Sequence, residues 1–250
     1  MDVYTERHGS GEPILFVHGA GGSSEYWYYQ KEHLKRHMEV LTIDLPGHGR
    51  SVGDGCRSIE EFREAVREAL QKLGIKKCYM AGHSMGGAIA MSFALAYPDI
   101  LKGIVLICTG ARLRALPAIL DGLMKDKEAT VRMIIDYAFS RKIPEKLKEK
   151  GFMDMMRCNA ETIYNDFVAC DRFDAMNLLK SIQTPSLIIC GEDDLLTPPK
   201  YSEYLHKIIR NSQLNLIRDA GHMAPLEKPE EINNMILPFV AEIEKARNGL

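Results

Sequence analysis

Short apolar runs alternate with segments of helical periodicity along most of the chain. The apolar runs occupy 13–17, 39–43, 77–81, 102–108, 185–190 and 213–217. Several are apolar at consecutive positions, which is typical of strands that a parallel sheet buries on both faces. Between them, 58–73 and 84–97 have helical patterns, and 229–246 starts with a proline, as many helices do. The alternation predicts an open, mostly parallel sheet with helices on both faces.

Two segments depart from this alternation. Residues 2–7, followed by a polar turn, predict an antiparallel edge strand. Residues 112–179 show no convincing strand pattern and instead carry amphipathic helical stretches interrupted by Pro117, Pro144 and Gly151. We therefore expect this second segment to be a helical insertion between two strands of the sheet.

The insertion divides the chain into a core, formed by 1–111 and 180–250, and a helical subdomain, formed by 112–179. The subdomain is rich in methionine, at Met124, Met133, Met153, Met155, Met156 and Met176. In the interpretation that we favour, these side chains form the subdomain's own core. In the other, some of them line an adaptable apolar pocket.

Length and composition fit one α/β domain. The chain has 250 residues, 46% of them hydrophobic and 26% charged, so it can bury a large core. The net charge of −2 gives no basic excess for binding nucleic acid or an anionic membrane. No apolar run approaches the roughly 18 residues of a membrane-spanning helix, and the polar N-terminus has no signal-peptide pattern. We expect a cytoplasmic protein that does not insert into membranes.

The cysteines show no metal-binding spacing. They are Cys56, Cys78, Cys108, Cys158, Cys170 and Cys190, without a C-x-x-C pair or a cluster with histidine. Several sit in or beside apolar runs. We predict small buried side chains in a reducing compartment rather than disulfides or metal ligands.

A G-x-S-x-G pattern at 82–86 marks a candidate nucleophile. The predicted strand 77–81 runs directly into it, and small residues of a predicted helix follow. Such a tight turn lifts the hydroxyl of Ser84 clear of the backbone, and the glycines remove side chains that would collide there. The alternative is a serine that only caps the helix; the strand and helix around it favour a nucleophile.

A serine nucleophile needs a base, and His222 has the best position among the eight histidines. It follows the last predicted strand, on a loop at the carboxyl edge of the sheet, where α/β proteins bind ligands. The alternative is a loop histidine that bonds only its own turn. Histidines in glycine-rich turns, His83 among them, fit supporting roles.

The group that orients the imidazole is expected in the turn 191–198, which also follows a strand. Glu192, Asp193 and Asp194 compete for this role. The order of serine, acid and histidine along the chain is that of one hydrolase architecture and of neither common serine-protease order.

Taken together, the motifs resemble those of the α/β-hydrolase fold family, in particular its cap-bearing serine esterases, lactonases and C–C hydrolases. They are HGAGG at 18–22, DLPGHGRS at 44–51, GHSMGG at 82–87, GEDDLLTP at 191–198 and GHMAPLEKPEE at 221–231. The resemblance covers nearly the whole chain. It implies that the helical insertion is a cap, placed before the last two strands of the sheet.

The resemblance also implies site residues. It selects Asp194 as the acid, so that Ser84, Asp194 and His222 form a triad, and assigns the oxyanion hole to the backbone N–H groups of Ala20 and Met85. No metal or cofactor is implied. Haloalkane dehalogenases and epoxide hydrolases of this family carry aspartate in place of the serine, so those chemistries are disfavoured.

Further positions are candidates for the substrate pocket or its loops. Trp27, His83 and Met124 are candidate pocket residues, although Trp27 could equally pack the following helix. Asp44 and Arg50 are expected to stabilise the DLPGHGRS loop.

The leading hypothesis is a hydrolase of small carboxylic esters, acting as a monomer or homodimer. A lactonase, thioesterase or C–C bond hydrolase would use the same triad, and cofactor-free haloperoxidation is a known side reaction of the family. A ligand receptor that signals through its cap is the alternative outside enzymes.

Overall fold

The computed structural model describes residues 3–249, which contain a seven-stranded sheet in the order β1-β3-β2-β4-β5-β6-β7. The strands are β1 (Thr5–Gly9), β2 (Pro13–Val17), β3 (Glu39–Ile43), β4 (Cys78–His83), β5 (Leu101–Ile107), β6 (Ser186–Gly191) and β7 (Ser212–Ile217). Strand β1 pairs with β3 in the antiparallel sense, whereas the other pairings are parallel. The predicted edge strand is therefore present, although its first predicted residue, at position 2, lies outside the described residues.

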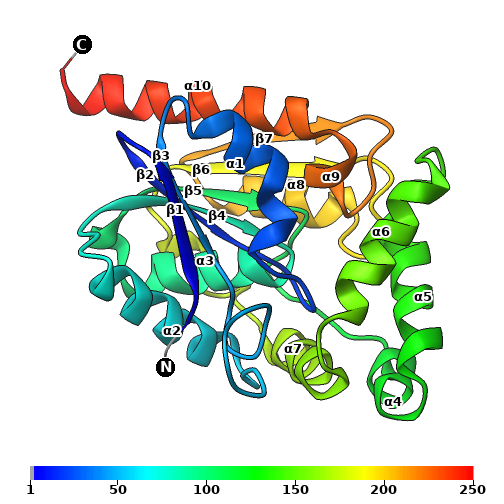
Figure 1. Cartoon of the computed structure of the whole chain (residues 1–250). Helices are drawn as coiled ribbons and strands as arrows, with labels where there is room; N and C mark the ends of the chain where they lie inside the picture. The colour runs from blue at the N-terminus through cyan, green and yellow to red at the C-terminus, as the bar shows by residue number, and fades with distance from the viewer. Residues whose placement is uncertain (1–2, 250) are drawn as a thin grey trace.

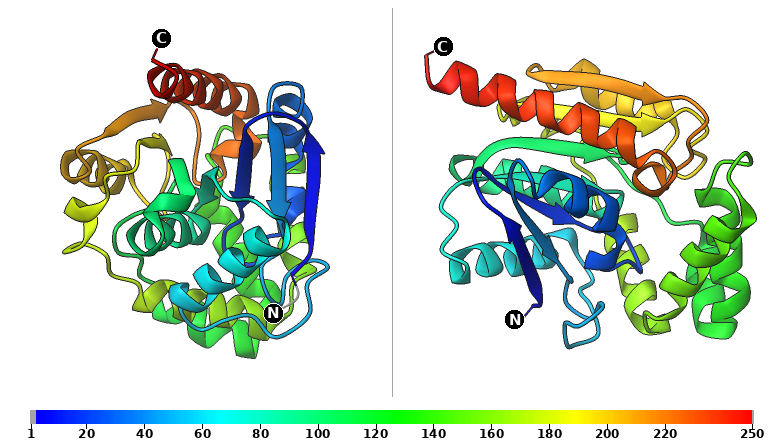
Figure 2. Two further views of the ribbon diagram at one scale, coloured as in Figure 1. Left: turned by 90° about the vertical axis from the view of Figure 1, so that its left-hand side faces the viewer. Right: turned by 45° about the horizontal axis from the view of Figure 1, so that its top comes forward.

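Helices cover both faces of the sheet (Figures 1 and 2). They are α1 (Tyr28–Leu34), α2 (Ile59–Lys72), α3 (Met85–Ala96), α8 (Pro199–Ile208), α9 (Ala224–Glu227) and α10 (Pro229–Arg247). Alternate residues of β2 point to opposite faces: Leu15 packs in the cluster with α2, α3 and α8, and Phe16 packs in the cluster with α1, α9 and α10. The consecutive apolar residues of the strands thus fill two cores, and the predicted fold class is confirmed.

A capping box fixes the start of α2. The Oγ atom of Ser58 accepts a hydrogen bond from the Glu61 N–H at 3.3 Å, and the Glu61 carboxylate accepts one from the Ser58 N–H at 3.1 Å. Two of the N–H groups left over at the helix start are satisfied in this way. The helix then presents its apolar face to α3 and the sheet.

Four helices form the insertion: α4 (Pro117–Lys125), α5 (Lys127–Ala138), α6 (Glu145–Met156) and α7 (Ala160–Arg172). We call them the cap helices; Figure 1 shows α4, α5 and α6 gathered at one end of the molecule. They share an apolar cluster of their own. An antiparallel bridge between Arg112 and Asp174 joins the two ends of the insertion.

The cap methionines do not all occupy the two expected environments. Met133, Met155 and Met156 pack against the cap's own cluster, as the favoured interpretation predicts. Met124 and Met153 are instead exposed, at 61% and 54%.

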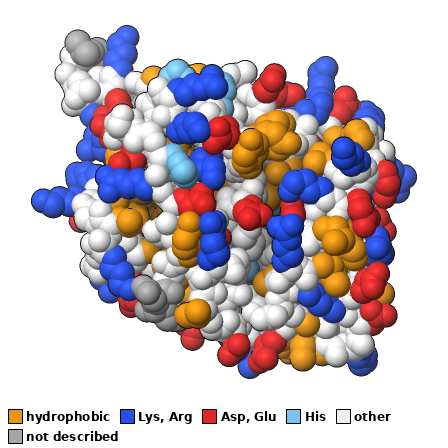
Figure 3. Space-filling view, viewed as in Figure 1, with side chains coloured by type: hydrophobic (Ala, Val, Ile, Leu, Met, Phe, Trp, Pro, Cys, Tyr) orange, Lys and Arg blue, Asp and Glu red, His pale blue; other side chains and the backbone are white. Residues whose placement is uncertain are grey.

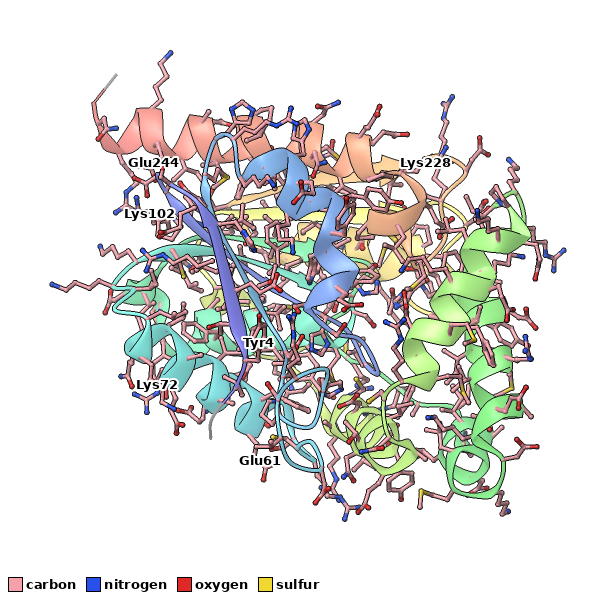
Figure 4. All side chains as sticks on the ribbon, in the orientation of Figure 1. Tyr4, Glu61, Lys72, Lys102, Lys228 and Glu244 are labelled. Atoms are coloured by element: carbon pink, nitrogen blue, oxygen red, sulfur yellow. The ribbon has the colours of Figure 1, made fainter. Side chains whose placement is uncertain are left out.

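A polar cluster fixes α10 to the sheet at the end away from the cap. The Lys102 Nζ donates to Glu244 Oε1 at 2.9 Å, and the Tyr79 hydroxyl donates to the same oxygen at 2.7 Å. Figure 4 labels Lys102 and Glu244 side by side at this end. The loops that carry Ser84, Asp194 and His222 lie at the other end of the strands.

Charged side chains of both signs are interspersed over the face in Figure 3, in keeping with the small net charge. Within residues 3–249, no helix has the length and apolar character needed to cross a membrane.

Candidate active site

Ser84 sits on a strained turn between β4 and α3. Its φ of 53° and ψ of −115° lie in a region that residues with a side chain seldom adopt. A Cβ atom at Gly86 would lie 2.2 Å from the Val17 carbonyl oxygen, and one at Gly82 would lie 2.1 Å from that of Gly86. Both glycines are therefore required for α3 to approach the sheet this closely. The turn is held by the Ser84 N–H, which donates to the Ile107 carbonyl at 3.0 Å.

His222 and Asp194 form a buried pair. The Nδ1 atom of His222 lies 2.9 Å from Asp194 Oδ2 and 3.2 Å from Oδ1. The N–H groups of Leu196 and Thr197 donate to Oδ1 at 2.9 and 2.8 Å, and the Thr197 hydroxyl donates to Oδ2 at 2.8 Å. Burial alone raises the pKa of Asp194, but the facing imidazole and these hydrogen bonds outweigh it and lower the pKa. Asp194 is therefore held as a carboxylate.

The other two acids of the turn point elsewhere. Glu192 and Asp193 are exposed, and the Asp193 carboxylate accepts a hydrogen bond from the Ser140 hydroxyl at 2.7 Å. Of the three acids left open by the sequence, Asp194 is the one whose carboxylate meets His222.

The loop that carries His222 is tied to the cap. The N–H groups of His222 and Met223 donate to the Ala138 carbonyl, at the end of α5, at 2.7 and 3.2 Å. The Glu227 carboxylate accepts from the N–H groups of Gly221 and Ser140 at 3.0 and 3.3 Å. The position of the imidazole thus depends on the backbone of the cap as well as on Asp194.

His83 packs against this loop and bonds its backbone. Its Nε2 lies 2.8 Å from the His222 carbonyl oxygen, and its ring stacks on Tyr26 with centroids 4.9 Å apart. Burial, with the neighbouring His222, lowers the pKa of His83 to about 3. His83 is consequently neutral near pH 7, and its Nε2–H donates to the carbonyl.

The glycine-rich loop 18–22 faces Ser84. His18 accepts the Leu45 N–H at Nε2, at 3.0 Å, so its Nδ1–H donates to the Gly19 carbonyl at 2.8 Å. Gly21 has a φ of +65°, and its N–H donates to Asp166 Oδ2 at 2.8 Å. Ala20 lines the same cavity as Ser84. Met85 is the first residue of α3, and N–H groups at that position have no acceptor within their own helix.

Asp44 and Arg50 stabilise the adjacent loop, as predicted. The Asp44 carboxylate accepts from the N–H groups of Ser24 and Arg50 at 2.6 and 2.9 Å. This arrangement joins the DLPGHGRS loop to the segment that follows the glycine-rich loop 18–22.

A cavity of about 390 Å³ opens above Ser84 and His222. Apolar side chains from the cap and from the core loops form most of its wall, among them Leu113, Ile119, Ile135, Met155, Phe167 and Leu196. Such a lining selects uncharged, apolar groups next to a few polar ones.

Of the three candidate pocket residues, His83 lines the cavity, whereas Trp27 and Met124 do not. Trp27 is fully buried in the sheet core, with its ring centroid 4.8 Å from that of Phe16. Met124 faces outward from α4, because the neighbouring Leu123 is the residue that turns into the cap.

The sequence analysis did not identify Thr197 or Asp166 as candidate site residues. Thr197 lies three residues after Asp194, a spacing at which an acid can accept from a following N–H and hydroxyl, so a local signal existed. Asp166 lies 145 residues from its partner Gly21, and nothing in its own helix marks it.

The buried cysteines offer no separate metal site in the part of the chain that the structure describes. One group of possible ligands combines Cys108 with Cys190 and Asp194, and another combines it with His83 and His222. Both groups use residues of the site described above. Burial raises the pKa of the Cys108 thiol, which therefore stays protonated.

The comparison with known families agrees with this geometry. A model described as the alpha/beta hydrolase family matches residues 14–235. The chain belongs to the alpha/beta hydrolase family. As a member of this family, it is 30% identical to RutD of Azorhizobium caulinodans, a protein named for carbamate hydrolysis, over 98% of this chain and 97% of that one.

Two further members are similar to this hydrolase. The 2-hydroxy-6-oxo-6-phenylhexa-2,4-dienoate hydrolase of Comamonas testosteroni is 27% identical, over 96% of this chain and 91% of the relative. A solved structure of a thermophilic esterase is 34% identical, with a TM-score of 0.86, over 96% of this chain and 99% of that one.

Proposed function

We propose that the protein hydrolyses small carboxylic esters through Ser84, His222 and Asp194. The observation that carries the proposal is the 2.9 Å contact between His222 Nδ1 and the buried Asp194, together with the apolar cavity that both His222 and Ser84 line. A carboxylate that holds Nδ1–H leaves Nε2 free to act as a base.

In the proposed reaction, His222 Nε2 takes the hydroxyl proton as Ser84 attacks the acyl carbon. The tetrahedral oxyanion accepts hydrogen bonds from the N–H groups of Ala20 and Met85. The imidazolium then protonates the leaving alcohol, and an acyl-enzyme remains on Ser84. Water, deprotonated by the same imidazole, hydrolyses it and restores the serine.

An ester fits the environment of Ser84 better than a charged substrate does. The wall of the cavity is largely apolar, so an uncharged acyl group is desolvated there at little cost. The 34% identity to a thermophilic esterase over nearly the whole of both chains supports the same substrate class.

Hydrolysis of a C–C bond next to a carbonyl is the second candidate. The observation that favours it is the 27% identity to the Comamonas testosteroni dienoate hydrolase. The same constellation also suits lactones, thioesters and carbamates, and RutD is named for the last of these. We place esters first because the thermophilic esterase is 34% identical to this chain, against 27% for the dienoate hydrolase.

The test is a panel of esters, lactones, thioesters and vinylogous diketones offered to the wild type and to Ser84→Ala. Loss of the serine is expected to lower ester turnover by about 10⁴–10⁶ without unfolding the protein. A fluorophosphonate should label the wild type at Ser84 and leave the variant unlabelled.

Ser92→Ala is the matched control, because Ser92 lies on the same helix and its hydroxyl contacts Arg63. It should keep wild-type labelling and turnover. Ester turnover that survives Ser84→Ala would contradict the covalent mechanism. Binding of esters without turnover, by a wild type that no fluorophosphonate labels, would favour a ligand receptor.

A further inference from the structure

One carboxylate of the cap bonds the glycine-rich loop 18–22, which we call the oxyanion loop because it carries Ala20. Asp166 lies on α7 and is fully buried. Its Oδ2 accepts from the Gly21 N–H and lies 2.8 Å from His48 Nε2 as well as 2.8 Å from the Gly21 nitrogen. A single oxygen atom of the cap therefore joins two loops of the core.

The backbone that Asp166 holds is the peptide directly after Ala20. The Gly21 N–H and the Ala20 carbonyl belong to the same planar unit, so fixing the N–H also fixes the direction of that carbonyl. The loop is tight, because the Gly22 N–H donates back to the Gly19 carbonyl at 3.1 Å. A rotation of the Ala20–Gly21 peptide would be transmitted to the N–H of Ala20.

The second partner, His48, holds the Asp166 carboxylate in place. Burial lowers the pKa of His48, but the charge of Asp166 and the hydrogen bond to it outweigh burial and raise the pKa. Both side chains are completely buried. Because buried ion pairs add little net stability compared with apolar packing, stability alone does not account for a carboxylate at this position.

We propose that Asp166 is a positioning residue for the oxyanion hole. It holds the Ala20–Gly21 peptide so that the Ala20 N–H is directed at the oxyanion, and it does so from the cap. The inference rests on the proposed function, since it assigns Ala20 to the oxyanion hole. It implies that the oxyanion hole is complete only while α7 is docked on the core.

Asp166→Ala removes the acceptor and is expected to lower kcat by about 10–100-fold, less than the roughly 10²–10³-fold of a deleted oxyanion donor, because the Ala20 N–H is displaced and not removed. The KM should stay within about twofold, because the bond acts on the transition state. Phenylboronic acid, which forms a tetrahedral adduct with an active serine, should lose affinity by the same factor as kcat/KM.

Asp166→Asn is expected to keep kcat within about threefold of the wild type, because the side chain still accepts the hydrogen bond that holds the oxyanion loop in the transition state. Its amide oxygen can still accept from Gly21, and its NH2 group can donate to Nε2 of a neutral His48. A purely electrostatic role of the carboxylate on the reaction would not allow this rescue.

The neighbouring Asn165 provides the matched control. Its Nδ2 donates to the Asp54 carbonyl at 2.9 Å, so it also ties α7 to a core loop but not to the oxyanion loop. Asn165→Ala should lower the Tm and leave kcat and the boronic acid affinity unchanged.

If Asp166→Ala does not fold, Asp166→Ser replaces it. A serine hydroxyl is too short to reach the Gly21 N–H, so the same loss of kcat and of boronic acid affinity as for Asp166→Ala is expected. Wild-type values in the folded alanine or serine variant, equal losses in Asp166→Ala and Asn165→Ala, or failure of Asp166→Asn to rescue would each overturn the proposal.

Fluorophosphonate labelling separates this proposal from the one on which it rests. A wild type that reacts with the probe and hydrolyses esters, together with an indifferent Asp166→Ala, contradicts only the role of Asp166. A wild type that neither reacts nor turns over contradicts the proposed function itself.

Discussion

At the scale of single residues, the site is held mainly by backbone groups. Asp194 accepts two N–H groups besides the imidazole, and the His222 and Gly21 backbones are fixed by acceptors on the cap. The side chains of the candidate site are thus positioned by loops, and those loops are held in place by hydrogen bonds to distant parts of the chain. The bonds that the Asp194 and Asp166 side chains accept can each be tested by a single substitution.

Asp194→Asn is expected to lower kcat by about 10⁴, because an asparagine NH2 facing Nδ1 stabilises the wrong tautomer of His222. The measurement is steady-state ester hydrolysis. Asp193→Asn is the control, because Asp193 is exposed and bonds Ser140 instead. It should change kcat little, and a reversed order of the two effects would show that the wrong acid has been assigned.

His83 should make stability depend on pH. Its pKa is about 3 in the folded protein, against about 6.5 for an unfolded histidine, so between these values only the unfolded chain binds the proton. The stabilisation from neutral His83 is therefore complete above about pH 6.5 and is lost as the pH falls towards 3.

His83→Gln should remove up to about 1.4 kcal/mol per pH unit from the slope of unfolding free energy against pH. Urea unfolding at pH 5, 6 and 7.5 measures this slope. The exposed His206→Gln serves as the control and should keep the wild-type slope. A His83 variant with an unaltered slope would mean that the histidine is charged when folded.

Local patterns sufficed for Ser84 and for the place of His222, because each signal lies within a few residues of the atom concerned. The acid of the turn was left open between three residues, and the family resemblance selected Asp194. The role of Asp166 had no local signal, since helical periodicity marks it only as an inward position. Which core atoms an inward residue meets is decided by tertiary packing.

At the scale of elements, the strands and helices follow the predicted order with small shifts. Strand β4 extends to His83, beyond the apolar run, because pairing with β5 continues through Gly82 and His83. Pairing is a property of two segments, which the pattern of one cannot reveal. For the same reason, the sequence could not say which faces of the cap helices line the cavity, and it misplaced Met124.

The cap helices are expected to limit the size of the substrate. They wall a cavity of about 390 Å³ and are bonded to the His222 loop and the oxyanion loop. In a series of p-nitrophenyl esters, kcat/KM should therefore peak at short to medium acyl chains and fall for long ones. The rate should not rise when a substrate passes its critical micelle concentration. A maximum at long chains with interfacial activation would show a mobile lid.

At the scale of the whole molecule, the fold class could be read from the sequence because strands buried on both faces give continuous apolar runs. The runs also give the position of the insertion between β5 and β6, where they stop. The bonds between insertion and core could not be read in this way, since they join residues far apart in the chain, such as Ser140 with Asp193 and Asp166 with Gly21. These bonds also decide whether the cap can open while the core stays folded.

The rate at which buried cysteines are alkylated would measure this opening. Burial raises the pKa of Cys158 in the cap and of Cys78 in the sheet core to about 12 alike, so either thiol reacts readily with a thiol reagent only after the structure opens. Because the cap is bonded to the catalytic loops, we expect the two thiols to be alkylated at the same rate, which is also the rate of global unfolding. Faster alkylation of Cys158 would show that the cap opens alone. With equal rates, cap and core form a single cooperative unit, in which every molecule that has lost its cap has also lost its active site.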